Sequence, residues 1–304
     1  MSSIELRFAT PRKLPKPRDL RGRVVVLDIA FASEAGGGSF LTTTKSFIDG
    51  LGARLAGWID HHDSTFHAMF RDDPRFLLTT KAEHGACPEL ITAELVERIG
   101  AIDTIVCHND FDGLVSAAKW LRKGVECYPG SDSDARAIDT CLFEPSAIGR
   151  RIDRALRARP RDEGLYGLII RHLHTGLTDA ALWLDLDEAA RGLDAIEKQT
   201  EELARGYVML NHRVAFVDAT RHASPYDKTM LLLQGQKART IAIVRDGDSV
   251  TVAAAFDSGL NFLSLLGLSG GMPTRVSIPQ KRLAELLTAL GVSTTLLPLV
   301  DELG

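Results

Sequence analysis

The chain has 304 residues, of which 45% are hydrophobic and 25% are charged, and its formal net charge is -4. This balance is typical of a globular protein with enough length for two domains, and it excludes a disordered or fibrous chain. The slightly acidic charge also argues against a generally basic surface, so no double-stranded DNA partner is expected.

The first 23 residues contain basic residues and prolines but no apolar core of a leader peptide, and they predict an extended arm. No uninterrupted apolar run of about eighteen residues occurs, so no membrane partner is predicted. The four cysteines form no CxxC pair, which favours small buried side chains in a reducing compartment over a disulfide or zinc framework. We therefore predict a cytoplasmic protein.

Three apolar runs in the first half of the chain end in side chains that can bind a metal ion. The runs cover residues 23–28, 55–60 and 103–108, and helical patterns lie between and after them. This alternation predicts parallel strands whose carboxyl ends meet at one edge of a sheet. The side chains expected at that edge are Asp28, Asp60, His61, His62, His108, Asp110 and Asp112.

The rest of the chain predicts a helical segment followed by a smaller domain. Apolar residues recur at helical spacing over residues 145–159, 163–174 and 179–207, and the last range is long enough to link two domains. Strand patterns take over from residue 212. We therefore predict an α/β fold with a parallel-sheet, metal-binding domain over residues 1–190, a linker helix over residues 191–210 and a smaller α/β domain over residues 211–304.

The residue types at the strand ends predict which metal they bind. Carboxylates and imidazoles without a thiolate favour manganese, magnesium, iron or cobalt over a structural zinc ion. The ligands are more than one octahedral ion usually draws from a protein, so they predict two divalent ions. Two such ions lower the pKa of a shared water and clamp phosphate oxygens, which is the chemistry of phosphate-ester hydrolysis. Taken alone, Asp60-His61-His62 would more simply be interpreted as a pair of histidines on the protein surface that binds no metal.

Taken together, these motifs resemble those of the DHH superfamily of phosphoesterases. Asp60-His61-His62 is similar to the signature tripeptide, and the run from His108 to Gly113 is similar to the superfamily's HxDxDG-type motif. Asp28 is similar to the single aspartate at a strand end that forms the superfamily's second motif. The turn from Gly270 to Arg275 resembles the glycine-rich substrate-binding turn of the second, DHHA1-like domain.

The resemblance implies a role for each matched residue. The implied metal ligands are Asp28 as the bridge, His108 and Asp110 on one ion, and His61 and Asp112 on the other. His62 would contact the phosphate and Asp60 would orient the histidines, so these two residues are the predicted catalytic pair. Gly270, Gly271 and Arg275 would bind the substrate.

The order of the motifs departs from the superfamily pattern, and one expected ligand has two candidates. The HxDxDG-type motif usually comes first, whereas here it follows Asp28 and Asp60, so the motif order is permuted and the strand connectivity is left open. The superfamily's fourth motif is a further aspartate on the second ion, and either Asp139 or Asp179 could be that residue. Asp139 is the first choice, because Asp179 lies at a helix start and could simply be an N-cap.

The predicted function is a metal-dependent phosphoesterase that hydrolyses a phosphomonoester or phosphodiester of a small nucleotide or short oligonucleotide. Its predicted cofactor is two divalent ions, with Mn²⁺ preferred and Mg²⁺ or Co²⁺ as alternatives. There are two alternatives among hydrolases. One is a single-strand exonuclease, which the arginines of residues 150–161 weakly favour, and the other is an inorganic pyrophosphatase. A non-catalytic nucleotide-binding regulatory protein is the alternative of another class, and a homodimer is left open.

Overall fold

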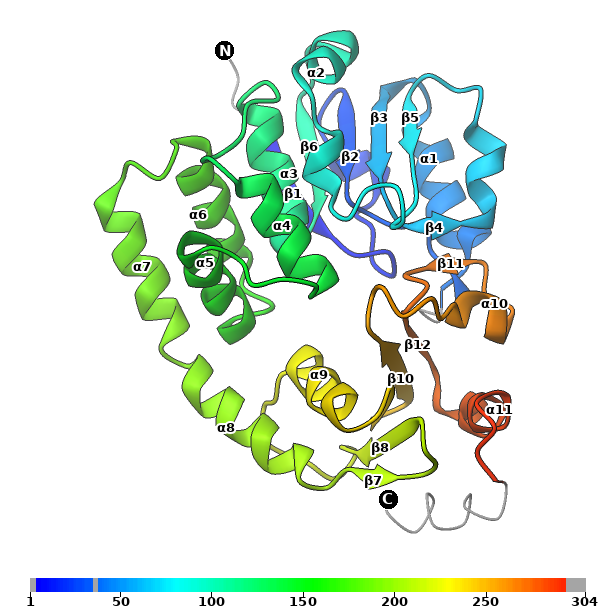
Figure 1. Ribbon diagram of the computed structural model, residues 1–304. Coiled ribbons are helices and arrows are strands. Elements are labelled where there is room, and N and C mark those ends of the chain that lie inside the picture. The colour runs from blue at the N-terminus through cyan, green and yellow to red at the C-terminus, as the bar shows by residue number, and fades with distance from the viewer. Residues whose placement is uncertain (1–3, 35–37, 294–304) are drawn as a thin grey trace. The chain divides into compact units, whose positions relative to one another are not determined.

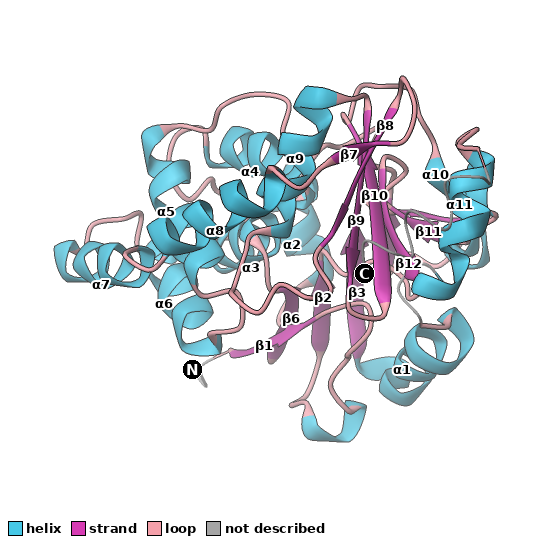
Figure 2. Ribbon diagram, turned by 90° about the horizontal axis from the view of Figure 1, so that it is seen from below, coloured by secondary structure: helices cyan, strands magenta, loops and turns pink. Residues whose placement is uncertain are grey.

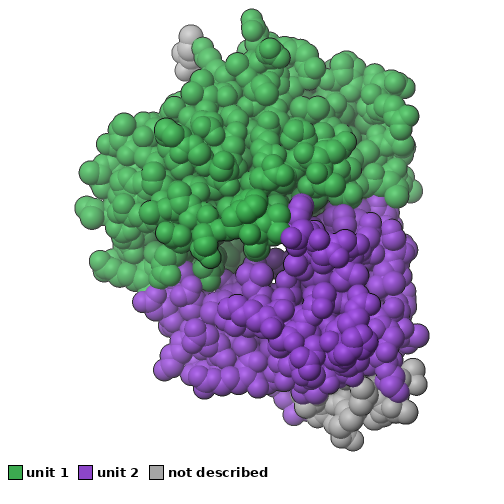
Figure 3. Space-filling model, in the orientation of Figure 1, with its two compact units in different colours: residues 1–32, 38–191 green, residues 33–37, 192–304 purple. Residues whose placement is uncertain are grey.

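The computed structural model describes residues 4–34 and 38–293, so the end of the predicted second domain, residues 294–304, lies outside the described residues. The chain divides into two compact units, coloured separately in Figure 3. Unit 1 comprises residues 1–32 and 38–191, and unit 2 comprises residues 33–37 and 192–304. The predicted boundaries of the functional domains stay a prediction.

Unit 1 is built on a five-stranded sheet in which all neighbouring strands are parallel (Figure 1). In spatial order the strands are β1 (Glu5–Ala9), β6 (Thr104–His108), β2 (Val24–Leu27), β3 (Leu55–Asp60) and β5 (Phe76–Leu78). Strands β1, β6, β2 and β3 are seen side by side in Figure 2. From β2 the chain continues to β3 on one side, whereas β6 lies on the other side of β2. Open α/β sheets form a ligand crevice at a point where the strand order reverses in this way, which is called a switch point.

Helices cover both faces of this sheet, because its central strand is apolar on both sides. Along β2, Val25 and Leu27 pack into one core cluster, while Val24 and Val26 pack into another. Successive side chains of a strand point to opposite faces, so a continuous run of valine and leucine fits a strand that is covered twice. The helices of this unit are α1 (Ser46–Leu51), α2 (Ala93–Ile99), α3 (Phe111–Leu121), α4 (Ser131–Thr140), α5 (Ala147–Ala158), α6 (Glu163–His174) and α7 (Ala180–Ala190), and a two-residue strand, β4 (Asp63–Ser64), follows β3.

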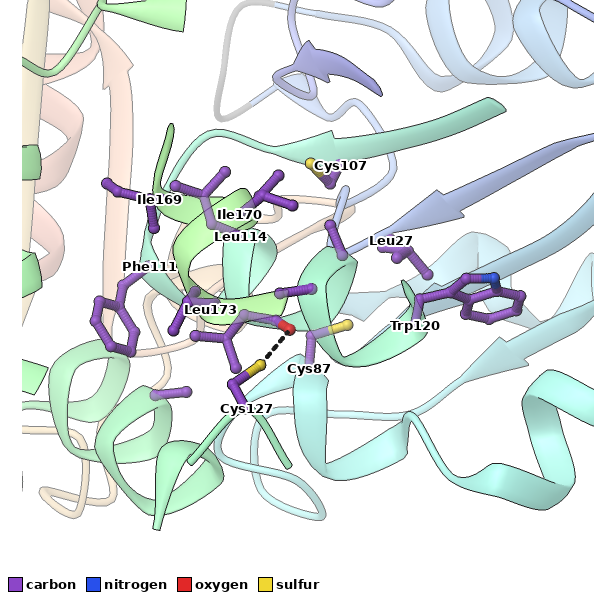
Figure 4. Close-up of a cluster of buried hydrophobic side chains, with 14 of the residues drawn as sticks. Leu27, Cys87, Cys107, Phe111, Leu114, Trp120, Cys127, Ile169, Ile170 and Leu173 are labelled. Atoms are coloured by element: carbon purple, nitrogen blue, oxygen red, sulfur yellow. Dashed lines mark hydrogen bonds between the residues drawn. The ribbon is translucent and has the colours of Figure 1, made fainter. Parts of the chain in front are cut away.

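The larger core of unit 1 lies between the sheet and the helices α3 and α6. Figure 4 shows Leu27 of the sheet in this cluster together with Leu114 of α3 and Ile170 of α6. Burying a side chain of this size contributes roughly 1.5–3 kcal/mol. The same cluster holds three of the four cysteines, whereas Cys141 is exposed, so the prediction that all four are buried is wrong for that one.

Unit 2 contains a second five-stranded sheet, in which only β8 and β9 are parallel. In spatial order its strands are β12 (Arg275–Pro279), β10 (Ser249–Ala254), β9 (Ile241–Asp246), β8 (Val214–Asp218) and β7 (Val208–Met209). Its other elements are α8 (Leu193–Ala204), α9 (Lys228–Ala238), α10 (Phe262–Leu266), β11 (Gly270–Gly271) and α11 (Leu283–Ala289). Leu231 of α9 packs with Val217 and Val244 of the sheet, while Leu286 of α11 packs with the opposite-facing Phe216 and Ile243.

The predicted fold class, an α/β protein with a parallel sheet followed by a smaller α/β unit, is confirmed. Within the described residues no helix is long and apolar enough to cross a membrane.

Three local predictions are wrong. The predicted arm contains β1, which pairs with β6 through backbone hydrogen bonds that its side-chain pattern does not reveal. The sequence Val-Glu-Cys-Tyr of residues 125–128 predicts a short strand, but these residues form an irregular segment with a bend at Cys127 and Tyr128. The helix predicted over residues 179–207 is two helices, α7 and α8, that are separated at Arg191 and Gly192, because glycine is a poor residue for a helix interior.

Candidate metal centre

The candidate centre lies at the carboxyl ends of three adjacent strands of unit 1. Leu27 of β2 is in register with Ile59 of β3 and with Cys107 of β6. The residue after each of these, namely Asp28, Asp60 and His108, therefore emerges at the same level of the sheet. The predicted convergence of the three motifs thus follows from the strand order and register.

Asp28 lies at the middle of the centre in an unusual backbone conformation. Its φ angle is 59°, in the left-handed region that few residues other than glycine, asparagine and aspartate adopt. Its backbone N–H donates to the carbonyl oxygen of Ile59 at 2.9 Å, which holds the turn in place. Such local strain persists where the surrounding structure imposes it, and it is common at functional sites.

The carboxylate of Asp28 is buried without hydrogen bonds of its own. Its exposed fraction is 1%, and neither oxygen accepts a hydrogen bond from any residue that the structure describes. Burial, together with the negative charges of Asp112 and Asp110, raises the pKa of Asp28 to about 6. Buried carboxylates normally have a hydrogen-bond donor or a positive charge beside them. A buried carboxylate without either, such as that of Asp28, fits a site for a cation.

A first group of ligand atoms, from Asp28, His108 and Asp110, converges on one point. These atoms all lie within 4.8 Å of one another. Nδ1 of His108 is 2.6 Å from Oδ2 of Asp110 and 3.6 Å from Oδ2 of Asp28, yet it has no hydrogen-bond partner of acceptable geometry. Two carboxylates and one imidazole that face each other without bonding form a donor set that fits a divalent ion.

The start of α3 explains why these residues can approach so closely. Asp110 is the N-cap of the helix, and its Oδ1 accepts a hydrogen bond from the N–H of Gly113 at 3.3 Å. A Cβ atom at position 113 would lie 2.6 Å from the carbonyl oxygen of His108. Only glycine therefore lets the helix begin directly beneath the end of β6, and Asp112 then falls in its first turn.

A second group combines His61, Asp112 and Asp139, the last of which comes from α4. Nε2 of His61 lies 3.3 Å from Oδ2 of Asp112 and 3.2 Å from Oδ1 of Asp28. Nδ1 of His61 lies 2.8 Å from the carbonyl oxygen of His84. A carbonyl oxygen can only accept, so Nδ1 carries the proton and Nε2 is the atom that faces the carboxylates.

Lys81 also belongs to the second group, and the sequence analysis missed it. Its side chain is 2% exposed, its Nζ lies 2.8 Å from Nε2 of His61, and it forms an ion pair with Asp139. Burial alone would lower the pKa of Lys81, but the charges of Asp139, Asp112 and Asp28 outweigh it and raise this pKa above its ordinary value. The available signal was that Lys81 closely follows β5, a fourth strand end at the same edge of the sheet.

The predicted catalytic pair is Asp60 and His62, and His62 also forms a third possible ligand group with Asp28 and His61. Asp60 is fully buried, and its Oδ1 is 2.7 Å from Nδ1 of His62. Burial raises the pKa of Asp60, but the interaction with His62 is stronger in sum and lowers it to about 2. The ionised carboxylate holds the Nδ1 proton of His62, whose side chain is 17% exposed and presents Nε2 as its remaining polar atom.

Among the described residues, the candidate ligand groups include none of the remaining candidates. Asp179 is the N-cap of α7, where its carboxylate accepts from the N–H of Ala181 at 2.9 Å, and no ligand group among the described residues includes it. In unit 2, Gly271 has a φ angle of 132°, which favours glycine, and Arg275 donates to Oγ1 of Thr229 at 3.0 Å. The role of Gly270, Gly271 and Arg275 in binding substrate stays a prediction.

No protein-family model and no curated protein sequence matches the chain. Two solved structures are similar to it in fold. One is the pGpG-specific phosphodiesterase PggH of Vibrio cholerae, which is 12% identical, with 89% of this chain and 97% of that chain covered and a TM-score of 0.41. The other is the exonuclease RecJ bound to manganese, which is 14% identical, with 92% of this chain and 74% of that chain covered and a TM-score of 0.45.

Proposed function

We propose that this chain is a metal-dependent phosphoesterase of the DHH type that hydrolyses a phosphate ester of a small nucleotide or short oligonucleotide. The observation that carries the proposal is the buried carboxylate of Asp28, which has no hydrogen bond and faces His108 and Asp110 at a switch point of the sheet. A cation completes this arrangement, and ligand crevices of α/β sheets lie at such points.

In this proposal Asp28, His108 and Asp110 hold a divalent ion, with Mn²⁺ preferred by the mixed carboxylate and imidazole ligands. A bound ion would neutralise charge on the phosphate and make water a stronger nucleophile. The sequence predicts a second ion at His61, Asp112 and Asp139. Asp28 lies between the two groups, because its Oδ1 is 3.2 Å from His61 while its Oδ2 faces His108.

His62 is the residue that acts on the substrate in this proposal. Its Nδ1–H is held by Asp60, so Nε2 is the atom left to act on the substrate. When the imidazole is protonated, its Nε2–H can donate to a phosphate oxygen or pass its proton to the leaving oxygen, which leaves the neutral imidazole behind. Asp60 keeps the imidazole in one orientation and one tautomer. The burial of Asp60 and the partial exposure of His62 match these two roles, since only the second residue must reach a ligand.

The arginines of residues 150–161 support a small substrate over a long single strand. Four of them form ion pairs with nearby carboxylates, namely Arg150 with Glu144, Arg151 with Asp187, Arg157 with Asp153 and Arg159 with Asp162. Arg151 is bound through two nitrogens at 2.7 Å each and also lies over the ring of Trp183. A groove for a long strand needs cations that are available to phosphates.

A substrate panel tests the proposal. The purified chain is assayed with Mn²⁺ and with Mg²⁺ on bis-p-nitrophenyl phosphate, cyclic dinucleotides, di- to tetranucleotides, a 3′,5′-bisphosphonucleoside and pyrophosphate. We expect hydrolysis of at least one small nucleotide ester, and loss of it in Asp110→Asn. Asp179→Asn is the matched control, since that carboxylate caps a helix. Tight nucleotide binding without hydrolysis of any panel member would instead indicate the regulatory alternative.

A further inference from the structure

The two ligand groups differ in one respect that changes the expected number of ions. The second group already contains a cation, the ammonium group of Lys81. We propose that this ammonium takes the place of one divalent ion, so that the centre holds a single ion at Asp28, His108 and Asp110 beside a built-in positive charge. This inference rests on the proposed function, since both concern the same centre.

The geometry of His61 is the first argument. Its Nδ1 faces the carbonyl oxygen of His84 at 2.8 Å, so Nε2 is its only atom that can bind an ion. Nζ of Lys81 lies 2.8 Å from Nε2, within hydrogen-bond distance. An imidazole nitrogen has a single lone pair, and an ion would have to approach Nε2 along the same direction as the ammonium. An ion and the ammonium therefore cannot both contact His61.

The anchoring of Lys81 is the second argument. Its side chain is 2% exposed, it pairs with Asp139, and its backbone N–H lies 3.3 Å from Oδ2 of Asp63. An ion that displaced the ammonium would also take Asp139 from it. A buried ammonium that loses its carboxylate partner is strongly unfavourable, and one that stays beside a divalent ion is repelled by it.

The first group offers the contrast that makes the assignment specific. Asp28 and Asp110 contact histidines and backbone, and among the described residues no lysine or arginine forms a hydrogen bond or ion pair with either of them. Nδ1 of His108 and both oxygens of Asp28 also lack hydrogen bonds. The first group is thus open to an ion, while in the second group the ammonium already supplies the positive charge.

The chemical consequence concerns how much positive charge the centre can offer. The ammonium supplies one unit of charge at a fixed place, and it holds His61 and Asp139 together without any metal. The side chains of the second group therefore act as a scaffold for Asp28, whose Oδ1 lies 3.2 Å from Nε2 of His61. The single ion alone would then act on the phosphate and the attacking water.

Counting bound ions tests this assignment without an activity assay. The full chain is stripped with a chelator, dialysed to equilibrium against Mn²⁺ and analysed by mass spectrometry for metal per chain. We expect one ion per chain for the wild type and two for Lys81→Ala, because removal of the ammonium frees His61, Asp112 and Asp139. Lys119→Ala is the matched control, since Lys119 is also buried and paired with a carboxylate, that of Asp132, and it should leave the count at one.

Asp139→Asn supplies a second comparison that does not depend on the folding of Lys81→Ala. If two ions were bound, this substitution would remove a ligand and lower the count from two to one, whereas we expect one ion both before and after it. Two ions on the wild type would overturn the inference and leave the proposed function intact. An unchanged count of one in a folded Lys81→Ala would also overturn it. No bound ion on the wild type would instead overturn the proposed function.

Discussion

Buried carboxylates at the ends of strands occur in both units, and their surroundings are opposite. In unit 2, Asp218 of β8 is in register with Arg245 of β9, and Nε of the arginine donates to Oδ2 of the aspartate at 2.7 Å. Burial raises the pKa of Asp218, but the hydrogen bond from Arg245 contributes to a net lowering. In unit 1, Asp28 has no such donor, and its pKa is raised to about 6.

The difference separates a carboxylate with a hydrogen-bonded counter-charge from a carboxylate without one. The pair in unit 2 is closed, since the side chains of Asp218 and Arg245 are 5% and 4% exposed and each is the other's partner. Asp28 is equally buried, but no described residue forms a hydrogen bond with its carboxylate, and in the proposed function a cation takes that place. Burial alone would not distinguish the two aspartates, whereas hydrogen bonding does.

The largest expected effect is on activity in Asp28→Asn. Loss of the central carboxylate removes a ligand of the proposed ion, so metal-dependent hydrolysis should fall by on the order of 10³-fold or more. Each factor of ten corresponds to about 1.4 kcal/mol of lost transition-state stabilisation. Initial rates on the best substrate of the panel, measured with saturating Mn²⁺, check this. A rate within a factor of ten of the wild type would remove Asp28 from the centre.

The same substitution should stabilise the metal-free protein. A carboxyl group whose pKa is about 6 in the folded state and 3.8 in the unfolded state contributes stability below pH 3.8, and that contribution is lost as the pH rises through 6. At pH 7 the free energy of unfolding of the chelated wild type should therefore be lower by up to about 3 kcal/mol because of the ionised Asp28. Asp28→Asn carries no charge at this position and avoids that loss. Denaturant unfolding in chelator at pH 5 and pH 7 measures this, and a less stable variant at pH 7 would contradict it.

Asp218→Asn should have the opposite profile. It leaves a buried guanidinium without its counter-charge, so we expect a loss of about 3 kcal/mol in the free energy of unfolding and no change in bound Mn²⁺. Because the folded pKa of Asp218 is lowered, the stability it contributes is present above its unfolded pKa and is lost as the pH falls through the folded pKa. Unfolding curves at pH 7 and pH 3 test both statements, and a change in metal content would break the comparison.

Asp60→Asn should have a smaller effect that is confined to turnover. The neutral amide no longer stabilises the Nδ1 proton of His62, and loss of such an orienting partner typically costs about 10–100-fold. We expect the decrease mainly in kcat, with the number of bound ions unchanged. His62→Gln is the companion variant. If Asp60→Asn still lowered the rate in a His62→Gln background by the same factor, Asp60 would not act through His62.

The smallest effect is expected for Asp179→Ala. Loss of an N-cap side chain costs about 1 kcal/mol, so α7 should be slightly less stable while hydrolysis and metal content stay at the wild-type level. Thermal unfolding and the metal count check the two parts. A loss of bound metal would return Asp179 to the candidates for the fourth ligand.

The strand ends were predictable from the sequence because each follows a short apolar run and carries polar side chains. Parallel register then brings Asp28, Asp60 and His108 together without further information. Lys81 was not predictable in this way, because its contact with His61 requires β5 to join the sheet beside β3. A lysine that follows a short strand and two threonines would ordinarily be taken as solvated surface.

The choice between two aspartates shows the same limit. Asp139 and Asp179 are both polar residues at or in a helix, and sequence spacing gives no distance from either to His61. The packing of α4 places Asp139 with His61 and Asp112, whereas the side chain of Asp179 is used by the backbone of its own helix. Likewise β1 was missed, because an edge strand of mixed polarity is defined by its partner rather than by its own pattern.

The most direct test of the account is restoration of hydrolysis by metal. The chelated wild type and Asp110→Asn are assayed on bis-p-nitrophenyl phosphate and on the nucleotide panel as Mn²⁺ is added back. The account predicts no hydrolysis in chelator, recovery of the wild type with Mn²⁺, and no recovery of Asp110→Asn. Hydrolysis that persists in chelator, or an Asp110→Asn rate equal to that of the wild type, would contradict it.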